Sequence, residues 1–215
     1  MTKAFVYTEL QINTPFNEVP WQKLNPKIKK QPGFINKTWL SGINAQTVGG
    51  LYTFDSIENA QKFVTGYFPA EPREFGVAHT SRIFDAEIVK EASKDMNSIH
   101  FGGSIEKEPV AYVYTEVQLG IPFGNVPWRK MNPVLKQQPG LMTKTWLSGV
   151  SAQTPGGFYG FDSLENAQKF AIDYFPTEAK QLNAAFKTMV FDAIATKEAS
   201  MDMHSPFYAE KTEAA

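Results

Sequence analysis

Two glutamates occupy the same place in two nearly identical stretches of the chain. Glu9 lies in AFVYTELQI and Glu116 lies in AYVYTEVQL, each within an otherwise apolar pattern. A carboxylate enclosed by apolar side chains has a raised pKa and can remove a proton near neutral pH. We therefore expect Glu9 and Glu116 to act as general bases or polar anchors. The alternative is that each forms a structural ion pair, with Lys37 or Lys144.

A third candidate base is His79, because imidazole is the side chain that titrates closest to neutral pH. The second stretch has Phe186 at the equivalent position, and Arg82 is likewise replaced by Met189. This local divergence predicts either a single asymmetric site that uses His79 or drift at exposed positions. His79 is also the only candidate for an axial haem ligand.

Aromatic and polar side chains in the same stretches could hold a flat ligand, since small-molecule pockets are largely apolar with a few polar groups. The two tryptophans can instead fill the core, and the strand-three tyrosines can simply pack there. The predicted substrate-binding residues are Tyr7, Tyr114, Gln11, Gln118, Lys37, Lys144, Trp39, Trp146, Tyr52 and Tyr159.

The composition excludes several classes of protein. The 215 residues carry a net charge of −1, which leaves no basic surplus for binding nucleic acid. The chain has no cysteine, and its three histidines are scattered, so disulfides and a metal site are not expected. The sequence shows no signal peptide and no long apolar run, which predicts a cytoplasmic protein without membrane contact.

The chain repeats itself without a gap. Residues 4–96 align with residues 111–203, and more than half of the paired residues are identical, including KTWLSG at 37–42 and 144–149. A unit of this length is a small domain rather than a solenoid repeat. We expect domains at 1–97 and 110–205, a linker at 98–109 and a C-terminal tail at 206–215.

Each repeat has the pattern of a β-α-β-β-α-β unit. Residues 4–12 alternate with period two and predict a strand, followed by a helix that Pro26 should interrupt. FINKTWLS and LYTFD predict strands two and three, with AQTVGG, including Gly49 and Gly50, as a turn between them. Ser56 with Asn59 opens the second helix, and residues 77–89 predict the fourth strand. This order is the ferredoxin-like α+β fold.

Such a unit leaves one face of its sheet bare. On the first strand that face carries Tyr7, Glu9 and Gln11, which recur in the second repeat. The simplest partner for it is the bare face of the other repeat, so two sheets would pack into a barrel. The mixture of aromatic and polar residues predicts a cavity between the two repeats, in an intrachain pseudo-dimer that could form a further homodimer.

The motifs of both repeats resemble the YdhR-like mono-oxygenases, small dimeric α+β barrels related in fold to the antibiotic-biosynthesis mono-oxygenases. In the first repeat the matching residues are Pro15, Phe16, Pro32 to Phe34, Lys37, Trp39, Gly49, Gly50, Tyr52, Phe54, Glu58, Ala60, Phe84 and Asp85. The second repeat keeps these motifs, except that Leu141 replaces the phenylalanine after Pro-Gly. Family members are usually single-domain homodimers, whereas this chain carries both halves.

The resemblance implies a cofactor-independent mono-oxygenase. Its substrates would be molecular oxygen and a small hydrophobic aromatic molecule, phenolic or polyketide-like, bound between the repeats. Such chemistry needs a base, a dry pocket and access for oxygen. The alternatives are a small-molecule binding protein without turnover, or a cyclase or isomerase that uses the same pocket.

Overall fold

The computed structural model describes residues 2–208 and contains the expected element order twice. The first repeat comprises β1 (Ala4–Gln11), α1 (Trp21–Lys29), β2 (Phe34–Ser41), β3 (Thr47–Phe54), α2 (Ile57–Lys62), α3 (Ala70–Phe75), β4 (His79–Asp85) and α4 (Lys90–Asp95). The second comprises β5 (Ala111–Val117), α5 (Trp128–Leu135), β6 (Leu141–Ser148), β7 (Pro155–Phe161), α6 (Leu164–Lys169), α7 (Phe175–Gln181), β8 (Phe186–Asp192) and α8 (Lys197–Asp202).

Local signals in the sequence account for the main helices. The Ser56 hydroxyl accepts a hydrogen bond from the Asn59 backbone amide and caps α2, as predicted. A π-helical turn, Phe63–Tyr67, follows α2 before α3 begins. The expected interruption at Pro26 does not occur, because α1 continues through this residue to Lys29. None of the helices between residues 2 and 208 has the length and apolar character needed to span a bilayer.

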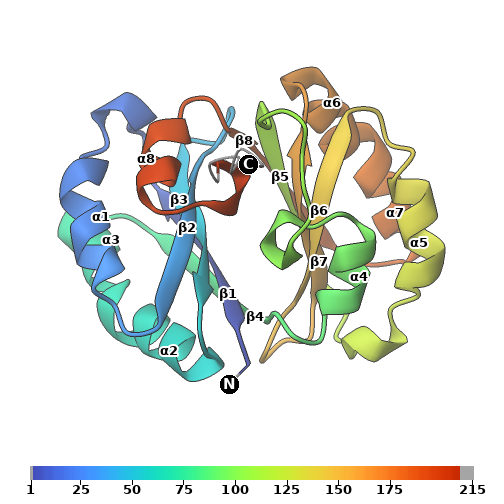
Figure 1. Ribbon diagram of the computed structural model, residues 1–215, viewed down its shortest axis with the longest axis horizontal. Coiled ribbons are helices and arrows are strands. Elements are labelled where there is room, and N and C mark those ends of the chain that lie inside the picture. Colours follow the sequence, from blue (N-terminus) through green and yellow to red (C-terminus); the bar gives the residue numbers. More distant parts are fainter. Residues whose placement is uncertain (1, 209–215) are drawn as a thin grey trace, which may run out of the picture.

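Each repeat forms one antiparallel four-stranded sheet in the ferredoxin-like order. The strand orders are β2-β3-β1-β4 and β6-β7-β5-β8. The two sheets face each other in the centre of the molecule, and most helices lie on the outer sides (Figure 1). The prediction of two ferredoxin-like repeats packed sheet to sheet is therefore confirmed.

The edge strands connect the two sheets into a barrel. Gly42, just after β2, bridges to Phe191 of β8, and Gly149, just after β6, bridges to Phe84 of β4. The Ile43 amide also donates to the Val190 carbonyl at 2.9 Å. Because each edge strand meets the opposite repeat, the barrel closes within one chain.

The fourth strand is shorter than predicted. β4 ends at Asp85, and the following residues form a turn and then α4 instead of continuing the strand. We call residues 86–103 the first arm and the equivalent residues 193–208 the second arm. The first arm ends in a 3₁₀ turn, Ile99–Phe101, and the second in the matching turn Pro206–Tyr208.

Each arm packs on the opposite repeat. In Figure 1, α4 lies beside α5, and α8 lies beside α1. The Lys144 amide of β6 donates to the Met96 carbonyl at 3.2 Å, and the Lys37 amide of β2 donates to the Met203 carbonyl at 3.0 Å. Residues 98–103 are thus a structured part of the repeat rather than linker. Residues 206–208 likewise pack in the core rather than forming a tail, and the rest of the expected tail, 209–215, lies outside the described residues.

Candidate functional site

The two faces of each sheet separate the predicted site residues into two groups. On β1, Tyr7 and Glu9 point toward the other sheet, as predicted from the alternation. Val6 points toward the helices and pairs with Tyr52, which in turn pairs with Lys37. Since paired residues in an antiparallel sheet lie on the same face, Lys37 and Tyr52 lie on the helix side.

The expectation that all these residues share one pocket between the repeats is therefore wrong. Trp39 is on the helix face too, packed at a ring-centroid distance of 5.7 Å from Phe16 in the core of the first repeat. The equivalent residues of the second repeat are Lys144, Trp146 and Tyr159, and they are arranged in the same way.

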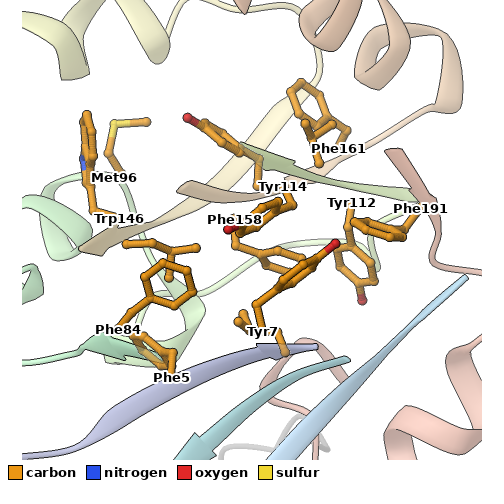
Figure 2. Close-up of a cluster of buried hydrophobic side chains, with 14 of the residues drawn as sticks. Phe5, Tyr7, Phe84, Met96, Tyr112, Tyr114, Trp146, Phe158, Phe161 and Phe191 are labelled. Atoms are coloured by element: carbon orange, nitrogen blue, oxygen red, sulfur yellow. The ribbon is translucent and has the colours of Figure 1, made fainter. Parts of the chain in front are cut away.

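On the face between the sheets, Tyr7 and Tyr114 stack on one another. Their ring centroids are 4.0 Å apart and their planes differ by 4°. Figure 2 shows the two tyrosines in the aromatic cluster between the sheets. Tyr7 donates a hydrogen bond to Glu9 at 2.7 Å, and Tyr114 donates to Glu116 at 2.8 Å. Burial and the neighbouring carboxylates raise the pKa of both phenols well above its usual value.

The two glutamates form ion pairs, but not with the predicted lysines. Glu9 pairs with Lys187 at 2.5 Å, and Glu116 pairs with Arg82 at 3.3 Å, so each cation comes from the fourth strand of the opposite repeat. Lys187 stands at the position of Thr80, and Arg82 at the position of Met189. β4 and β8 therefore differ in sequence at these two positions. Each strand carries a cation at one of these positions, and each cation pairs with the glutamate of the opposite repeat.

Gln11 and Gln118 lie at the mouths of the barrel. Gln118 lines an open surface groove with Arg82 and Glu116, while Gln11 lines a second one with Glu9. His79 is exposed at the start of β4, with its ring edge-on to Phe68 at 5.6 Å. It lines neither of these grooves nor the apolar cavity described next. The structure therefore separates His79 from the two glutamates, which flank the stacked tyrosines.

An apolar cavity of about 90 Å³ lies within the second repeat, between its sheet and helices α5 and α7. The sheet contributes Thr115, Lys144, Trp146 and Tyr159 to its wall, and Met131 and Glu178 lie on the helix side. An apolar lining with a few polar groups is typical of a small-molecule site, and a volume of about 90 Å³ corresponds to roughly one aromatic ring rather than a drug-sized ligand.

Lys144 is the unusual polar group of this cavity. Its side chain is fully buried, and Nζ lies 2.8 Å from the centroid of the Trp146 ring and 5.0 Å from that of Tyr159. Burial lowers the pKa of Lys144 well below its ordinary value, with no opposing effect from any charge among residues 2–208. The amine is thus biased toward its uncharged form, which can accept a proton.

The first repeat contains the same cluster with one electrostatic difference. Lys37 Nζ lies 2.7 Å from the Trp39 ring centroid and 4.7 Å from that of Tyr52. Burial also lowers the pKa of Lys37, but the negative charge of Glu71 opposes this shift. Glu71 accepts a hydrogen bond from Tyr67 at 3.1 Å.

Two glycines make room for each cluster. Gly49 and Gly50 were expected in a turn but lie inside β3, and Gly156 and Gly157 lie inside β7. A Cβ atom at Gly156 would lie 2.2 Å from the Thr115 carbonyl oxygen, and one at Gly157 would lie 2.7 Å from the Tyr159 ring. The glycine pair therefore allows close strand packing and leaves space for the tyrosine at the cavity.

Sequence reasoning missed the partner of each tryptophan. The Trp146 indole N–H donates to Asn132 Oδ1 at 2.9 Å, and the Trp39 indole donates to Asn25 at the same distance. A buried indole N–H requires an acceptor. The asparagine before the helical proline recurs in both repeats, so the signal was present, but the sequence does not show which helix face meets the tryptophan.

Comparisons with known proteins agree with this architecture. Residues 8–97, which span the first repeat, match the family model described as "Putative mono-oxygenase ydhR". The structure is similar to that of an anthrone oxidase-like protein, with a TM-score of 0.59 and 14% identity over 89% of this chain and 91% of that one. No curated protein matches the sequence.

Two chlorite dismutase structures share the fold. One is described as a putative chlorite dismutase, with a TM-score of 0.55 and 8% identity over 94% of this chain and 99% of that one. A mutant chlorite dismutase from Candidatus Nitrospira defluvii has a TM-score of 0.51 and 6% identity over 93% and 96% of the two chains. At such identities the likeness concerns the fold alone. The motif match and the architecture agree: residues 8–97, which lie in the first repeat, are similar to the family described as putative mono-oxygenase ydhR.

Proposed function

We propose that the chain is a cofactor-independent mono-oxygenase that oxidises a small, flat, hydrophobic phenolic or polyketide-like molecule, one ring of which enters the cavity of the second repeat. The observation that carries this proposal is a buried amine, Lys144, which has no ion-pair partner among residues 2–208 and lies in an apolar cavity against the face of Trp146. The match of residues 8–97 to the putative mono-oxygenase family model and the fold shared with an anthrone oxidase-like protein support a mono-oxygenase-like activity.

The proposed reaction begins with proton transfer from an acidic C–H or O–H group of the substrate to Lys144 Nζ. The ammonium that forms lies over the Trp146 ring, whose face attracts a cation. The dry cavity leaves the substrate anion poorly solvated and electron-rich, so it can react with molecular oxygen.

The atoms of the oxidation balance without another reductant. The carbanion donates an electron pair to O₂, and a C–O bond forms to give a hydroperoxide after protonation by the lysine. Cleavage of the O–O bond, with loss of the second hydrogen from the same carbon, then leaves a carbonyl and releases water. Overall, a CH₂ group and O₂ become a C=O group and H₂O.

Oxygen uptake with a panel of anthrone-like compounds, each of which carries an acidic CH₂ group, tests this function. We expect uptake by the intact protein and a loss of about 100-fold or more in Lys144→Met, since it removes the base. Lys130→Met, a change at an exposed lysine of α5, is the matched control. Uptake no greater than that of denatured protein would overturn the proposal.

The same experiment separates the rival functions. Product formation that continues without oxygen would indicate a cyclase or isomerase that uses the same lysine as its base. Saturable quenching of tryptophan fluorescence without loss of the ligand would indicate a binding protein. Either result would overturn the oxygenation step.

A further inference from the structure

Each repeat has a cluster of one buried lysine, one tryptophan and one tyrosine on the helix face of its sheet. The tryptophan of each cluster is held by residues from both repeats. In the second repeat, the backbone amide of Trp146 donates to Ser93 Oγ of the first arm at 2.9 Å. Its indole N–H donates to Asn132 Oδ1 at 2.9 Å. The first arm therefore contacts the residue directly, and it also contacts Asn132.

Asp95 and the Ala92 carbonyl, both on the first arm, together determine which way the Asn132 amide faces. Asn132 Nδ2 donates to Asp95 Oδ2 at 2.8 Å and to the Ala92 carbonyl at 3.0 Å. An indole N–H can only donate, and an ionised carboxylate can only accept. The asparagine thus has one satisfied orientation, with its oxygen toward Trp146 and its nitrogen toward Asp95.

The charge of Asp95 is maintained in this position. Lys136, directly after α5, donates to Asp95 Oδ1 at 2.9 Å, and its hydrogen bond together with that of Asn132 holds the pKa of Asp95 below its usual value. Asn132 is completely buried, so loss of the acceptor would leave its amide only partly satisfied. The chain of contacts runs from Asp95 through Asn132 and the Trp146 ring to Lys144.

The first repeat repeats this arrangement with the second arm. Trp39 donates through its backbone amide to Ser200 Oγ and through its indole to Asn25, both at 2.9 Å. Asn25 Nδ2 donates to Asp202 Oδ2 at 2.8 Å, and Lys29 pairs with Asp202 at 2.9 Å. Because every one of these contacts recurs in both repeats, we interpret them as a specific hydrogen-bond network rather than a chance hydrogen bond.

We propose that Asp95 is a positioning residue for the site of the second repeat, and Asp202 for that of the first, so that each site is completed by the arm of the opposite repeat. This inference rests on the proposed function for its catalytic consequence, but its structural content is independent of turnover. It gives a physical reason for both halves to be present, since an isolated repeat lacks the arm that orients its tryptophan.

We call the chain of contacts from Asp95 through Asn132 to Trp146, and its equivalent in the first repeat, the relay. Indole N–H signals in ¹H–¹⁵N NMR spectra test the relay without any substrate. Trp146 and Trp39 are first assigned with Trp→Phe variants. We expect Asp95→Ala to shift the Trp146 signal and to speed its hydrogen exchange at least about tenfold, while the Trp39 signal stays in place. Asp202→Ala should shift the Trp39 signal and speed its hydrogen exchange, while the Trp146 signal stays in place.

Two further variants exclude a general loss of packing. Glu91→Ala removes another contact between the first arm and α5, the 3.6 Å ion pair with Arg129, and should leave the Trp146 signal unchanged. Asp95→Asn keeps an oxygen acceptor for Asn132 and should largely restore the wild-type signal. It also remains informative if Asp95→Ala does not fold, because its smaller shift should again be confined to Trp146.

The outcomes separate this inference from the proposed function. An unchanged Trp146 signal in Asp95→Ala, or equal shifts of Trp146 and Trp39, would overturn the relay. If the relay is observed and turnover exists, kcat/KM in a Lys37→Met background should fall about tenfold in Asp95→Ala, because a misplaced tryptophan misplaces the base. If the relay is observed but wild-type protein takes up no oxygen, the relay stands and the proposed function fails.

Discussion

Lys144 and Lys37 are amines enclosed by protein, each facing an indole ring. Burial of a lysine opposes its charge, so the folded state prefers the neutral amine and the chain loses stability by keeping the residue there. Such a destabilising group at the wall of an apolar cavity is typical of a functional site. Glu9 and Glu116 differ, since each has a tyrosine donor and a cationic partner that account for its position.

Lys144→Met should stabilise the protein while it removes the proposed base. Methionine has a similar volume and no charge to desolvate, so we expect a gain of about 1–3 kcal/mol in the free energy of unfolding at pH 7. Denaturant unfolding measures this gain, with Lys130→Met as the control. A destabilised Lys144→Met protein would contradict the view that the lysine is strained by burial.

The same lysine predicts a pH dependence of stability. Because the pKa of Lys144 is lowered in the folded state, the unfolded chain binds more protons between the folded-state pKa and about 10.4. Above about pH 10.4 Lys144 is neutral in both states and does not lower the free energy of unfolding. As the pH falls from there toward the folded-state pKa, the free energy of unfolding decreases. Unfolding at pH 7 and pH 9.5 should show a smaller rise for Lys144→Met than for wild type. Equal slopes would contradict the lowered pKa.

At the scale of the elements, the register of β2 against β3 decides which face carries the lysine and the tryptophan. The pairing shifts between Phe34 and Asn36, and the equivalent irregularity lies between Leu141 and Thr143. A shift of one residue moves every following side chain to the opposite face of the sheet. The glycine pairs of β3 and β7 then leave the room that the long side chains occupy.

Gly157→Ala should close part of the cavity without unfolding the protein. Its Cβ would lie 2.7 Å from the Tyr159 ring, so the ring must move into the cavity, at a cost of about 1–3 kcal/mol for overpacking. Fluorescence titration with an aromatic ligand should show weaker binding. Gly124→Ala is the matched control, because nothing lies within 4 Å of the added Cβ. Equal affinities for the two variants would argue against a ligand in this cavity.

At the scale of the whole molecule, the crossed arms and the bridged strand edges join the repeats into one closed barrel. The edge strands β2 and β6 meet β8 and β4, and each is also contacted by an arm. Because these edges are occupied within the chain, we expect a monomer rather than the further homodimer that the family's dimeric state suggests. Native mass spectrometry tests this, and a dimer at low micromolar concentration would contradict it.

His100 lies where the first arm meets both repeats. Its Nδ1 is 2.8 Å from Thr145 Oγ1, and its ring contacts those of Phe5 and Phe207. Burial lowers the pKa of His100 to about 3. The unfolded chain, with a histidine pKa near 6.5, therefore binds the extra proton first as the pH falls.

Acidification should accordingly weaken the wild-type protein through His100. The stability is complete above about pH 6.5 and falls by roughly 3 kcal/mol by pH 4. His100→Phe places here the residue that the second repeat has at the equivalent position, Phe207, and should remove most of this loss. His79→Phe, which places at an exposed histidine the residue type that the second repeat has at the equivalent position, Phe186, is the control. Parallel acid unfolding of wild type and His100→Phe would contradict the assignment.

The duplication, the element order and the inward face of the first strand follow from the amino-acid sequence alone. Identity between repeats needs no coordinates, and the period-two pattern separates Tyr7 and Glu9 from Val6. The capping pair at Ser56 and Asn59 also lies within one turn of helix. These features are local, so short-range rules of backbone and side-chain geometry are sufficient to predict them.

Which residues meet depends on how the two repeats pack. β2 is buried on both faces from Lys37 to Leu40, so burial does not distinguish its helix side from its barrel side, and a single irregularity between Phe34 and Asn36 sets the face of Lys37 and Trp39. The cations of Glu9 and Glu116 and the aspartates behind each tryptophan come from the opposite repeat. Contacts of that kind depend on how two sheets and two arms pack together, which no local periodicity encodes.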